Sequence, residues 1–231
     1  MQMLAATIKA MYKGEKKHVH VAIMPCSAKK DEARREKFNG DVDYVLSTQE
    51  VVRMIKEHGI HFKYLQETQP DNPFEEHTGA SIIFGASGGV MEAALRTAVE
   101  TITGKTIDNI EYKEVRGMQG VKDAEYQVGD LKVKVAVVSG LKNARELCEK
   151  VKNGQADYHF IEVMSCPGGC INGAGQPFVD AFKRSDMDYK GKRATGLYNT
   201  DAGMKLRKSH DNGAIKEMYK SFFGEVGGHK A

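Results

Sequence analysis

The sequence predicts an α/β fold in which a mostly parallel sheet is flanked by helices, and two observations support this. Segments with the composition of strands alternate with segments of helical periodicity along the 231 residues. The stretch K-V-K-V-A-V-V-S over 132–139 becomes fully apolar toward its end, which is typical of a strand in a sheet buried on both faces. Ligands of such sheets bind beyond the carboxyl ends of the strands, so active-site loops are expected there.

The N-terminal elements are predicted from periodicity and composition. Apolar residues at helical spacing predict a helix over 1–12, which is followed by a basic turn over 13–17. A β-branched stretch predicts a strand over 18–24, and the charged segment 31–37 is expected to be exposed. A second, short strand is predicted over 43–47.

Capping and turn residues delimit the next part of the chain. Thr48 is expected to cap a helix that ends at His58. The proline-containing segment 66–79 is predicted to be a loop, long enough to be functional or mobile. A short apolar strand over 81–84 is expected to lead through the turn G-A-S-G-G into a helix over 90–103.

The C-terminal half is predicted to continue the alternation of strands and helices. Its expected elements are strands over 110–115, 124–128 and 132–139, a helix capped by Asn143 and running through 152, a strand over 160–164, helical structure from 176 onward with breaks over 199–203 and 209–213, and a last helix over 214–223. Three loops with distinctive residues follow predicted strands, over 24–29, 84–89 and 164–170.

The composition narrows the class of protein. Hydrophobic residues make up 41% and charged residues 28%, as in an ordinary globular protein. The net charge of +3 gives no case for binding nucleic acid or an anionic membrane surface. No apolar run approaches the roughly 20 residues that span a bilayer, and the amphipathic N-terminus lacks a cleavage-site pattern. We therefore expect a cytoplasmic protein whose four cysteines are ligands or core residues rather than disulfides.

Three of the cysteines lie in distinctive contexts. Cys26 belongs to M-P-C-S-A-K-K-D-E, and Cys166 and Cys170 belong to E-V-M-S-C-P-G-G-C-I-N-G-A-G-Q-P over 162–177. The C-x3-C pair has a proline and two glycines between its thiols, and glycine lets backbone approach a bulky group closely. Cys148 lies between charges in the middle of a predicted helix, which favours a structural role.

Three interpretations of these thiols remain open on the residues alone. Buried cysteines often act as small hydrophobic residues. A zinc site usually shows C-x2-C or C-x4-C pairs and needs four ligands, and no histidine lies near the C-x3-C pair in the sequence. An iron–sulfur cube suits soft thiolates, and a glycine-rich backbone can donate N–H groups to its sulfides.

Several segments together resemble one family, the iron-only ([FeFe]) hydrogenases. The stretch over 24–32 is similar to that family's second signature, M-P-C-x-x-K-x-x-E, and the stretch over 162–177 resembles its third, E-x-M-x-C-x-x-G-C-x-x-G-G-G-x-P. The segment I-I-F-G-A-S-G-G-V-M-E-A-A-L-R-T-A over 82–98 and the tail R-K-S-H-D-N-G-A-I-K over 207–216 are also similar to the family. The resemblance covers essentially the whole chain and implies part of the two-lobed iron hydrogenase fold.

The resemblance implies a six-iron centre, the H-cluster, in an enzyme of anaerobic metabolism that reversibly reduces protons to H2. In this centre a [4Fe-4S] cubane is joined by one cysteine to a di-iron unit carrying CO, cyanide and a bridging dithiolate. By the match, Cys26 and Cys166 would bind the cubane, and Cys170 would bind it and bridge to the di-iron unit. The further implied roles are a hydrogen bond to cyanide from Lys29, support from Glu32, and a di-iron pocket lined by Met24, Phe84 and Met164.

Two departures from the family pattern qualify what the chain would do alone. The first signature, T-S-C-x-P-x-W, which would supply the fourth cubane cysteine and a proton-relay cysteine, is absent, as is the N-terminal ferredoxin-like domain. We therefore expect residues 1–231 to be a partial H-cluster domain, as a fragment or as one piece of a split enzyme, with weak activity alone. Its expected partners are a redox protein such as ferredoxin and a missing N-terminal part or second subunit. Ala174 replaces a glycine of the third signature.

Two other classes of function compete with this interpretation. Non-catalytic relatives serve in cluster assembly or as hydrogen sensors, but the implied di-iron pocket residues are all present here, which favours the hydrogenase branch. The stretch G-A-S-G-G over 85–89 also fits the short G-x-S-x-G pattern of serine hydrolases. Ser87 would then be the nucleophile, with His159, His210 or His229 as its base, and the cysteines would remain unexplained.

Overall fold

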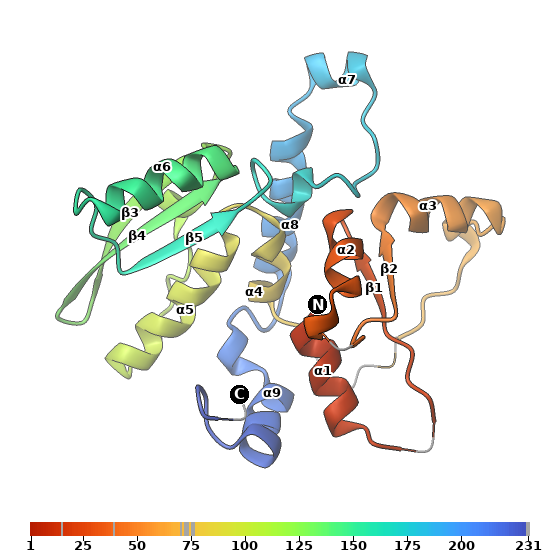
Figure 1. Cartoon of the computed structure of the whole chain (residues 1–231), viewed down its shortest axis with the longest axis horizontal. Coiled ribbons are helices and arrows are strands. Elements are labelled where there is room, and N and C mark those ends of the chain that lie inside the picture. Colours follow the sequence, from red (N-terminus) through yellow and green to blue (C-terminus); the bar gives the residue numbers. More distant parts are fainter. Residues whose placement is uncertain (15, 39, 70, 72–73, 75–76, 230–231) are drawn as a thin grey trace. The chain divides into compact units, whose positions relative to one another are not determined.

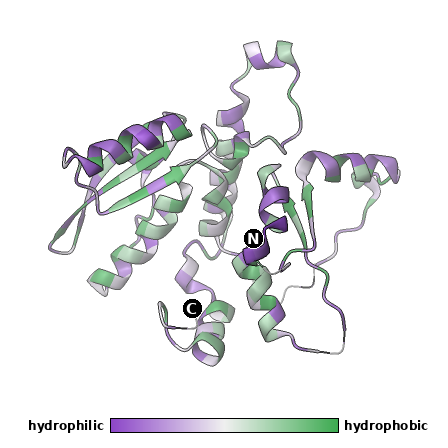
Figure 2. Cartoon of the chain, in the orientation of Figure 1, coloured by the Kyte–Doolittle hydropathy of each residue, from purple (hydrophilic) through white to green (hydrophobic). Residues whose placement is uncertain are grey.

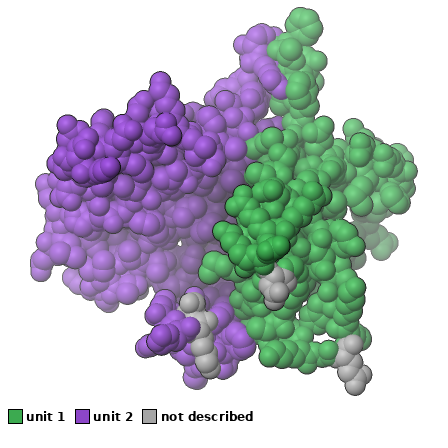
Figure 3. Space-filling model, in the orientation of Figure 1, with its two compact units in different colours: residues 1–71, 173–183 green, residues 72–172, 184–231 purple. Residues whose placement is uncertain are grey.

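Two units make up the part of the chain that the computed structural model describes, which is residues 1–14, 16–38, 40–69, 71, 74 and 77–229. Unit 1 comprises 1–71 and 173–183, and unit 2 comprises 72–172 and 184–231 (Figure 3). The predicted turn at 13–17 and the predicted loop at 66–79 lie partly outside the described residues. None of the described helices is long and apolar enough to cross a membrane.

Unit 1 contains a two-stranded parallel sheet with helices before and after its strands (Figure 1). Its elements are α1 (Gln2–Met11), β1 (Val21–Met24), α2 (Ala28–Arg34), β2 (Tyr44–Ser47) and α3 (Thr48–Glu57). β1 pairs with β2 from Val21↔Tyr44 to Met24↔Ser47. Buried Ala5 of α1 packs with Val42 and Val45, so a small apolar core joins α1 to the sheet.

The start of α3 shows how side chains set an element boundary. Ser47, rather than the predicted Thr48, is the N-cap, because its Oγ accepts the Glu50 N–H while the Glu50 carboxylate accepts the Ser47 N–H. Lys30 of α2 donates to the same carboxylate at 2.7 Å and holds the pKa of Glu50 at about 2. The charged segment 31–37, which we expected to be exposed, therefore begins within α2, and Lys30 of the same helix is tied to α3.

The core of unit 2 is a three-stranded sheet with a helix on each face. Strands β3 (Val121–Val128) and β4 (Leu131–Ser139) are antiparallel, and β4 pairs in parallel with β5 (Phe160–Met164). Met91 and Leu95 of α5 (Gly89–Thr103) pack on Val135 and Val137, while Leu147 of α6 (Leu141–Lys152) packs on Ala136 and Val138. Figure 2 shows hydrophilic colour along α6 and hydrophobic colour on the strands beside it. The α/β class and the predicted two-sided burial of β4 are confirmed.

Two predicted strands of unit 2 are wrong. Residues 81–84 lie instead in helix α4 (Gly79–Ile82) and in a 3₁₀ turn over Ile83–Gly85, and residues 110–115 contain only a 3₁₀ turn over Lys113–Val115. Thr78 begins α4, because its Oγ accepts the Ser81 N–H and its carbonyl accepts the Ser81 hydroxyl. Local side-chain bonds of this kind compete with strand pairing, and the apolar run is too short to overcome them.

The remaining helices complete unit 2 and correct two further details. They are α7 (Ala181–Asp186), which begins in unit 1, α8 (Tyr189–Gly203), α9 (Gly213–Met218) and a π-helical turn over Tyr219–Phe223. The predicted break at 199–203 is wrong, because α8 continues through it. Asn143 does not cap α6 but lies inside it and donates to the Ser139 carbonyl, and the helix begins after Gly140.

A network of buried charges joins α5 to α8. Arg96 is 1% exposed and donates to both oxygens of Asp201 at 2.7 and 2.8 Å, and to Glu92 at 2.7 Å. Arg116 donates to Glu92, and Arg207 donates to Asp201 at 2.7 Å. Each buried carboxylate is thus shared by two guanidinium groups, which is what allows these charges to lie out of water. The need to pair Asp201 explains why α8 persists where its sequence suggested a break.

We predict that Arg96→Ala lowers the free energy of unfolding by about 3–5 kcal/mol, because it leaves Glu92 and Asp201 buried with an incomplete set of partners. Urea denaturation followed by circular dichroism measures this change. The matched control is Arg145→Ala on the exposed face of α6, for which we expect a change within about 0.5 kcal/mol. Equal losses in the two variants would contradict a structural role for the network.

A second ion pair of unit 2 predicts a pH dependence of stability. Lys208 donates to Glu100, which also accepts from the Ile107 N–H at 2.7 Å and contacts His210 Nε2 at 2.8 Å, and these contacts lower the pKa of Glu100 from 4.5 to about 2. Because folding lowers this pKa, the stabilisation is present above pH 4.5 and is lost as the pH falls toward 2.

We therefore expect Glu100→Gln to lower the free energy of unfolding by about 1 kcal/mol at pH 7 and to match the parent protein near pH 2. Thermal unfolding across pH 2–7 measures the difference between the two proteins. Glu146→Gln on exposed α6 should show a difference near zero at every pH. A difference for Glu100→Gln that stayed constant with pH would argue against ionisation as its cause.

Candidate functional site

The two cysteines of the third motif flank a tight turn in unit 2. The Gly169 N–H donates to the Cys166 carbonyl at 2.9 Å, which closes a four-residue turn, and Cys170 begins a 3₁₀ turn over Cys170–Asn172. Gly168 has a φ of +82°, the value that the third position of a type II turn after proline requires. The turn brings the backbone atoms of its ends within about 7 Å, so both half-buried cysteines lie on one small loop.

This cysteine turn is held by backbone atoms of the G-A-S-G-G loop. The Ser87 N–H donates to the Gly168 carbonyl at 3.1 Å, and the Gly168 N–H donates to Ser139 Oγ at 3.4 Å. A Cβ on Gly169 would lie 2.5 Å from the Ser87 nitrogen, so no side chain fits at this position. The glycines are therefore explained by close backbone contact beside the two cysteines.

Glu162 fixes the loop that holds the turn. Its carboxylate, 5% exposed on β5, accepts the Gly88 and Met91 N–H groups at 2.7 Å each. These are unpaired donors at the start of α5, where a negative charge is also favoured by the helix dipole. Strand β5, which leads into the cysteine turn, thus also binds the start of helix α5 through Glu162.

Lys122 of β3 contacts the same loop. Its ammonium is within hydrogen-bonding distance of the Ser87 carbonyl at 3.2 Å, Ser87 Oγ at 3.3 Å and the Gly117 carbonyl at 2.8 Å. Burial lowers the pKa of Lys122 to about 8, while the charge of Glu162 acts in the opposite direction. The roles of Lys122 and Glu162 were not predicted from sequence, although each is a charged residue in phase with the buried face of its strand.

Cys26 lies in unit 1, in the loop between β1 and α2, and carries a half-buried free thiol. Gly175 packs directly on this loop: its N–H donates to the Pro25 carbonyl at 3.1 Å, and its carbonyl accepts the Gln49 N–H at 3.0 Å. A Cβ on Gly175 would lie 2.7 Å from the Cys26 nitrogen. The end of the third motif is therefore built against the second motif by backbone contact.

The other predicted site residues have varied surroundings. Met24 is half-buried and packs against the core of unit 1, and Met164 is half-buried at the end of β5. Phe84 is 45% exposed and follows a helix rather than the strand we predicted. Lys29 forms an ion pair with Glu32 one turn along α2.

Cys148 and Ala174 differ from the residues of the two motifs. Cys148 is exposed on α6, away from the buried face that Leu147 presents to the sheet. Ala174 is exposed, so its methyl group does not crowd the loop in the way a side chain on Gly175 would.

Ser87 is not placed as a serine nucleophile would be. It is 1% exposed, and its Oγ lies beside the Lys122 ammonium rather than a histidine. The His210 ring contacts Glu100 and Thr97, and His159 Nδ1 accepts the Lys134 N–H. The loop before α5 also follows a 3₁₀ turn instead of a strand, which a nucleophile elbow requires.

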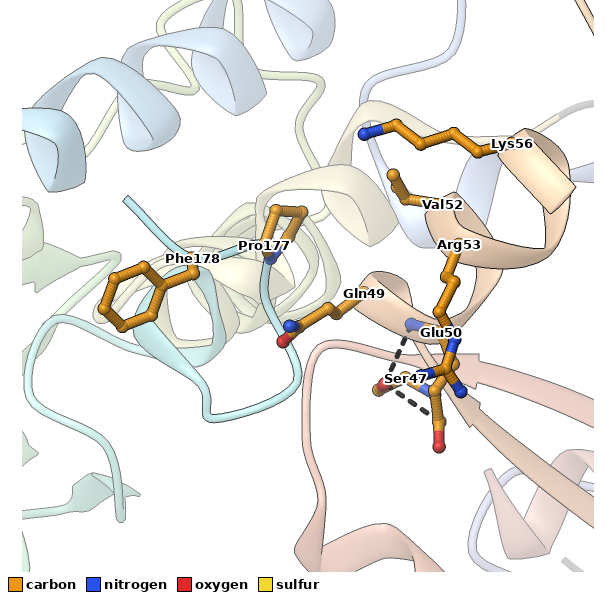
Figure 4. A pocket seen from close by; sticks show the side chains of 8 residues that line it. All are labelled: Ser47, Gln49, Glu50, Val52, Arg53, Lys56, Pro177 and Phe178. Carbon is orange, nitrogen blue, oxygen red and sulfur yellow. Dashed lines mark hydrogen bonds between the residues drawn. The ribbon is translucent and has the colours of Figure 1, made fainter. Parts of the chain in front are cut away.

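Unit 1 also has an open hollow of about 530 Å³ beside α3. Figure 4 shows side chains of α3 on one side of it and the Pro177–Phe178 segment on the other, with the Ser47–Glu50 hydrogen bonds dashed. The residues that line it are Ser47, Gln49, Glu50, Val52, Arg53, Lys56, Pro177 and Phe178. The hollow therefore adjoins Gln49, whose N–H binds Gly175, and its rim carries the cations Arg53 and Lys56.

The cysteines are the residues of this site that could bind metal. Within the described ranges, no three or more His, Cys, Asp or Glu side chains gather to hold one metal ion. An iron–sulfur cubane makes a different demand, because each of its irons takes one thiolate. The cysteine turn offers two of the four thiolates that a cubane takes, on a backbone that glycine keeps narrow.

Family profiles match most of the chain. The family described as "Iron only hydrogenase large subunit, C-terminal domain" matches residues 1–174, and "Iron hydrogenase small subunit" matches residues 187–231. The match to a small-subunit family was not foreseen from the sequence.

Curated relatives and solved structures agree with these matches. The chain is 43% identical to iron hydrogenase 1 of Clostridium pasteurianum, over 91% of this chain and 38% of the relative. It is 45% identical to the NADP-reducing hydrogenase subunit HndD of Solidesulfovibrio fructosivorans, over 97% and 39% of the two chains. A solved variant of the [FeFe]-hydrogenase HydA1 from Chlamydomonas reinhardtii is 35% identical, with a TM-score of 0.76 over 100% of this chain and 66% of that one. The chain thus spans about two fifths of the length of these curated relatives.

We predict that Gly175→Ala lowers the midpoint of thermal unfolding, because the new methyl group must displace the backbone at Cys26. Overpacking of this kind costs about 1–3 kcal/mol. The neighbouring Ala174→Gly exchange is the matched control, and its effect should stay below about 1 kcal/mol because Ala174 is exposed. Differential scanning calorimetry of both variants tests this, and an unchanged midpoint for Gly175→Ala would refute the tight contact.

Proposed function

This chain belongs to the family of iron-only hydrogenases, and from that premise we propose that it forms the cluster-binding part of a hydrogenase catalytic domain. In the proposal Cys26, Cys166 and Cys170 hold a [4Fe-4S] cubane, and Cys170 also links it to a di-iron unit. When bound, this group supplies the redox chemistry that interconverts protons and H2. The protein holds the group, excludes water from it and tunes its charge.

The observation that carries the proposal is the pair of glycine contacts beside the cysteines. Gly169 packs on the Ser87 nitrogen next to Cys166 and Cys170, and Gly175 packs on the Cys26 nitrogen. A core thiol has no need of such contacts, whereas a loop folded narrowly around an inorganic cube does. The order of the motifs and the identities of 43% and 45% to hydrogenases support the same conclusion.

The side chains near these loops have distinct proposed roles. Lys29 would donate a hydrogen bond to an anionic ligand of the di-iron unit, and Glu32 would orient Lys29 through their ion pair. Met24, Phe84 and Met164 would provide apolar surface that keeps water from the reacting atoms. The exposure of Phe84 in this chain fits a residue that is covered only when further protein or cofactor is present.

Activity is proposed for the complete assembly rather than for these residues alone. A fourth cubane ligand and a proton relay would come from another part of a longer chain or from a second subunit, and electrons from a redox partner such as ferredoxin. The matches to a large-subunit and a small-subunit family support a multi-subunit context. A cytoplasmic, anaerobic setting is part of the proposal.

The proposal predicts which thiols are needed for iron uptake. The full chain and its Cys26→Ser, Cys166→Ser and Cys170→Ser variants are reconstituted anaerobically with iron and sulfide. We expect each of these variants to bind less than half the iron of the parent chain, because serine replaces the soft thiolate that iron–sulfur clusters favour. Iron analysis and visible absorption provide the readout.

Cys148→Ser is the matched control, since this thiol is exposed on α6 and should not affect iron binding. Parallel assays of hydrogen evolution with reduced viologen should give little activity for the chain alone. Iron binding that depended on Cys148 as strongly as on Cys166 would show adventitious loading and would count against the proposal.

A further inference from the structure

A buried lysine beneath the cysteine turn has no carboxylate among its contacts. Lys122 is 5% exposed and projects from the same face of β3 as Ala124, Tyr126 and Val128, which are buried or half-buried. In the described part of the chain, its ammonium contacts only neutral oxygens, two of Ser87 and one of Gly117. Buried charges are usually paired with an opposite charge, whereas this ammonium is held by three neutral acceptors.

The nearest acidic side chain that acts on Lys122 is already engaged. Lys122 lies opposite Val137, and Val137 lies opposite Glu162, so one row across the sheet carries a lysine, a valine and a glutamate. Adjacent strands are about 4.8 Å apart, which separates the Cα atoms of Lys122 and Glu162 by roughly 10 Å. Both carboxylate oxygens of Glu162 accept N–H groups at the start of α5. Because a helix start is itself partly positive, the local balance of charge remains positive.

The positive charge is connected to the cysteine turn by a short path. Lys122 contacts the carbonyl and hydroxyl of Ser87, the Ser87 N–H donates to Gly168, and Gly168 lies between Cys166 and Cys170. Met118, near Gly117, packs against the other side of the turn, where a Cβ on Gly168 would lie 2.9 Å from its sulfur. Lys122 therefore binds the loop that contacts the cysteine turn, and its positive charge lies one hydrogen-bonded residue away from that turn.

We propose that Lys122 is a positioning and electrostatic residue for the iron–sulfur cluster, whose negative charge completes the balance at this buried cation. The inference rests on the proposed function. A cubane bound by thiolates is anionic, and it becomes more so when it takes up an electron. A fixed positive charge close to it stabilises the reduced form more than the oxidised form, and so raises the reduction potential.

The test compares the full chain with Lys122→Met, Lys122→Gln and Lys122→Arg after anaerobic reconstitution with iron and sulfide. Redox titration followed by electron paramagnetic resonance gives the midpoint potential of the cluster. We expect removal of the charge to weaken the preference for the reduced form about tenfold, a shift of about 59 mV to more negative potential for a one-electron couple. Lys122→Arg should stay within about threefold of the parent, and exposed Lys150→Met on α6 should be unchanged.

Thermal unfolding of the same proteins before and after reconstitution separates this role from a purely structural one. We expect Lys122→Met to lose more stability, relative to the parent chain, in the loaded form than in the iron-free form. Lys122→Gln keeps a donor for Ser87 without the charge, and it provides the measurement if Lys122→Met does not fold.

Equal potentials for the parent and Lys122→Gln, at equal iron content, would overturn the inference while leaving the proposed function intact. An equal loss of stability with and without iron would also overturn it, in favour of a structural lysine. Failure of the parent chain itself to take up iron would contradict the proposed function, and the inference with it.

Discussion

Contact between backbone segments without intervening side chains is the constraint on which the site depends. At Gly169 a single methyl group would meet the Ser87 nitrogen, and at Gly175 it would meet the Cys26 nitrogen. These contacts fix the paths of the two cysteine-bearing loops, each within its own unit. The regular elements β1, β5 and α5 lie at the ends of these loops and hold them in place.

Charge is distributed in unit 2 in two contrasting ways. The Glu92–Arg96–Asp201 network is closed, because each carboxylate there is matched by guanidinium groups. The row formed by Lys122, Val137 and Glu162 is open, in the sense that its two charges do not pair. Glu162 accepts N–H groups at the start of α5, and Lys122 contacts neutral oxygens. The closed network pairs every buried charge and so stabilises the fold, whereas the open row is the arrangement from which we propose a role for Lys122.

The sequence was most informative where one interaction dominates. Burial of the second half of β4 and the existence of strand β5 could be predicted, because apolar burial alone decides them. The helical structure of segment 81–84 could not be predicted, because its apolar residues are typical of a strand whereas the hydrogen bonds between Thr78 and Ser81 close a helical turn. The cysteine turn was visible as a motif. Lys122 and Glu162, by contrast, are brought into one row because both pair with Val137, and this strand register cannot be read from any local sequence pattern. Resemblance to a family supplied the chemistry that the residues left open.

The Arg96 network has a consequence for biosynthesis. Glu92, Arg96 and Arg116 leave the ribosome well before Asp201 and Arg207, because translation runs from the N-terminus. Until α8 emerges, the nascent chain has an arginine that lacks its main counterion and cannot be sequestered without cost. The buried network of unit 2 can therefore be completed only after α8 and Arg207 have been synthesised.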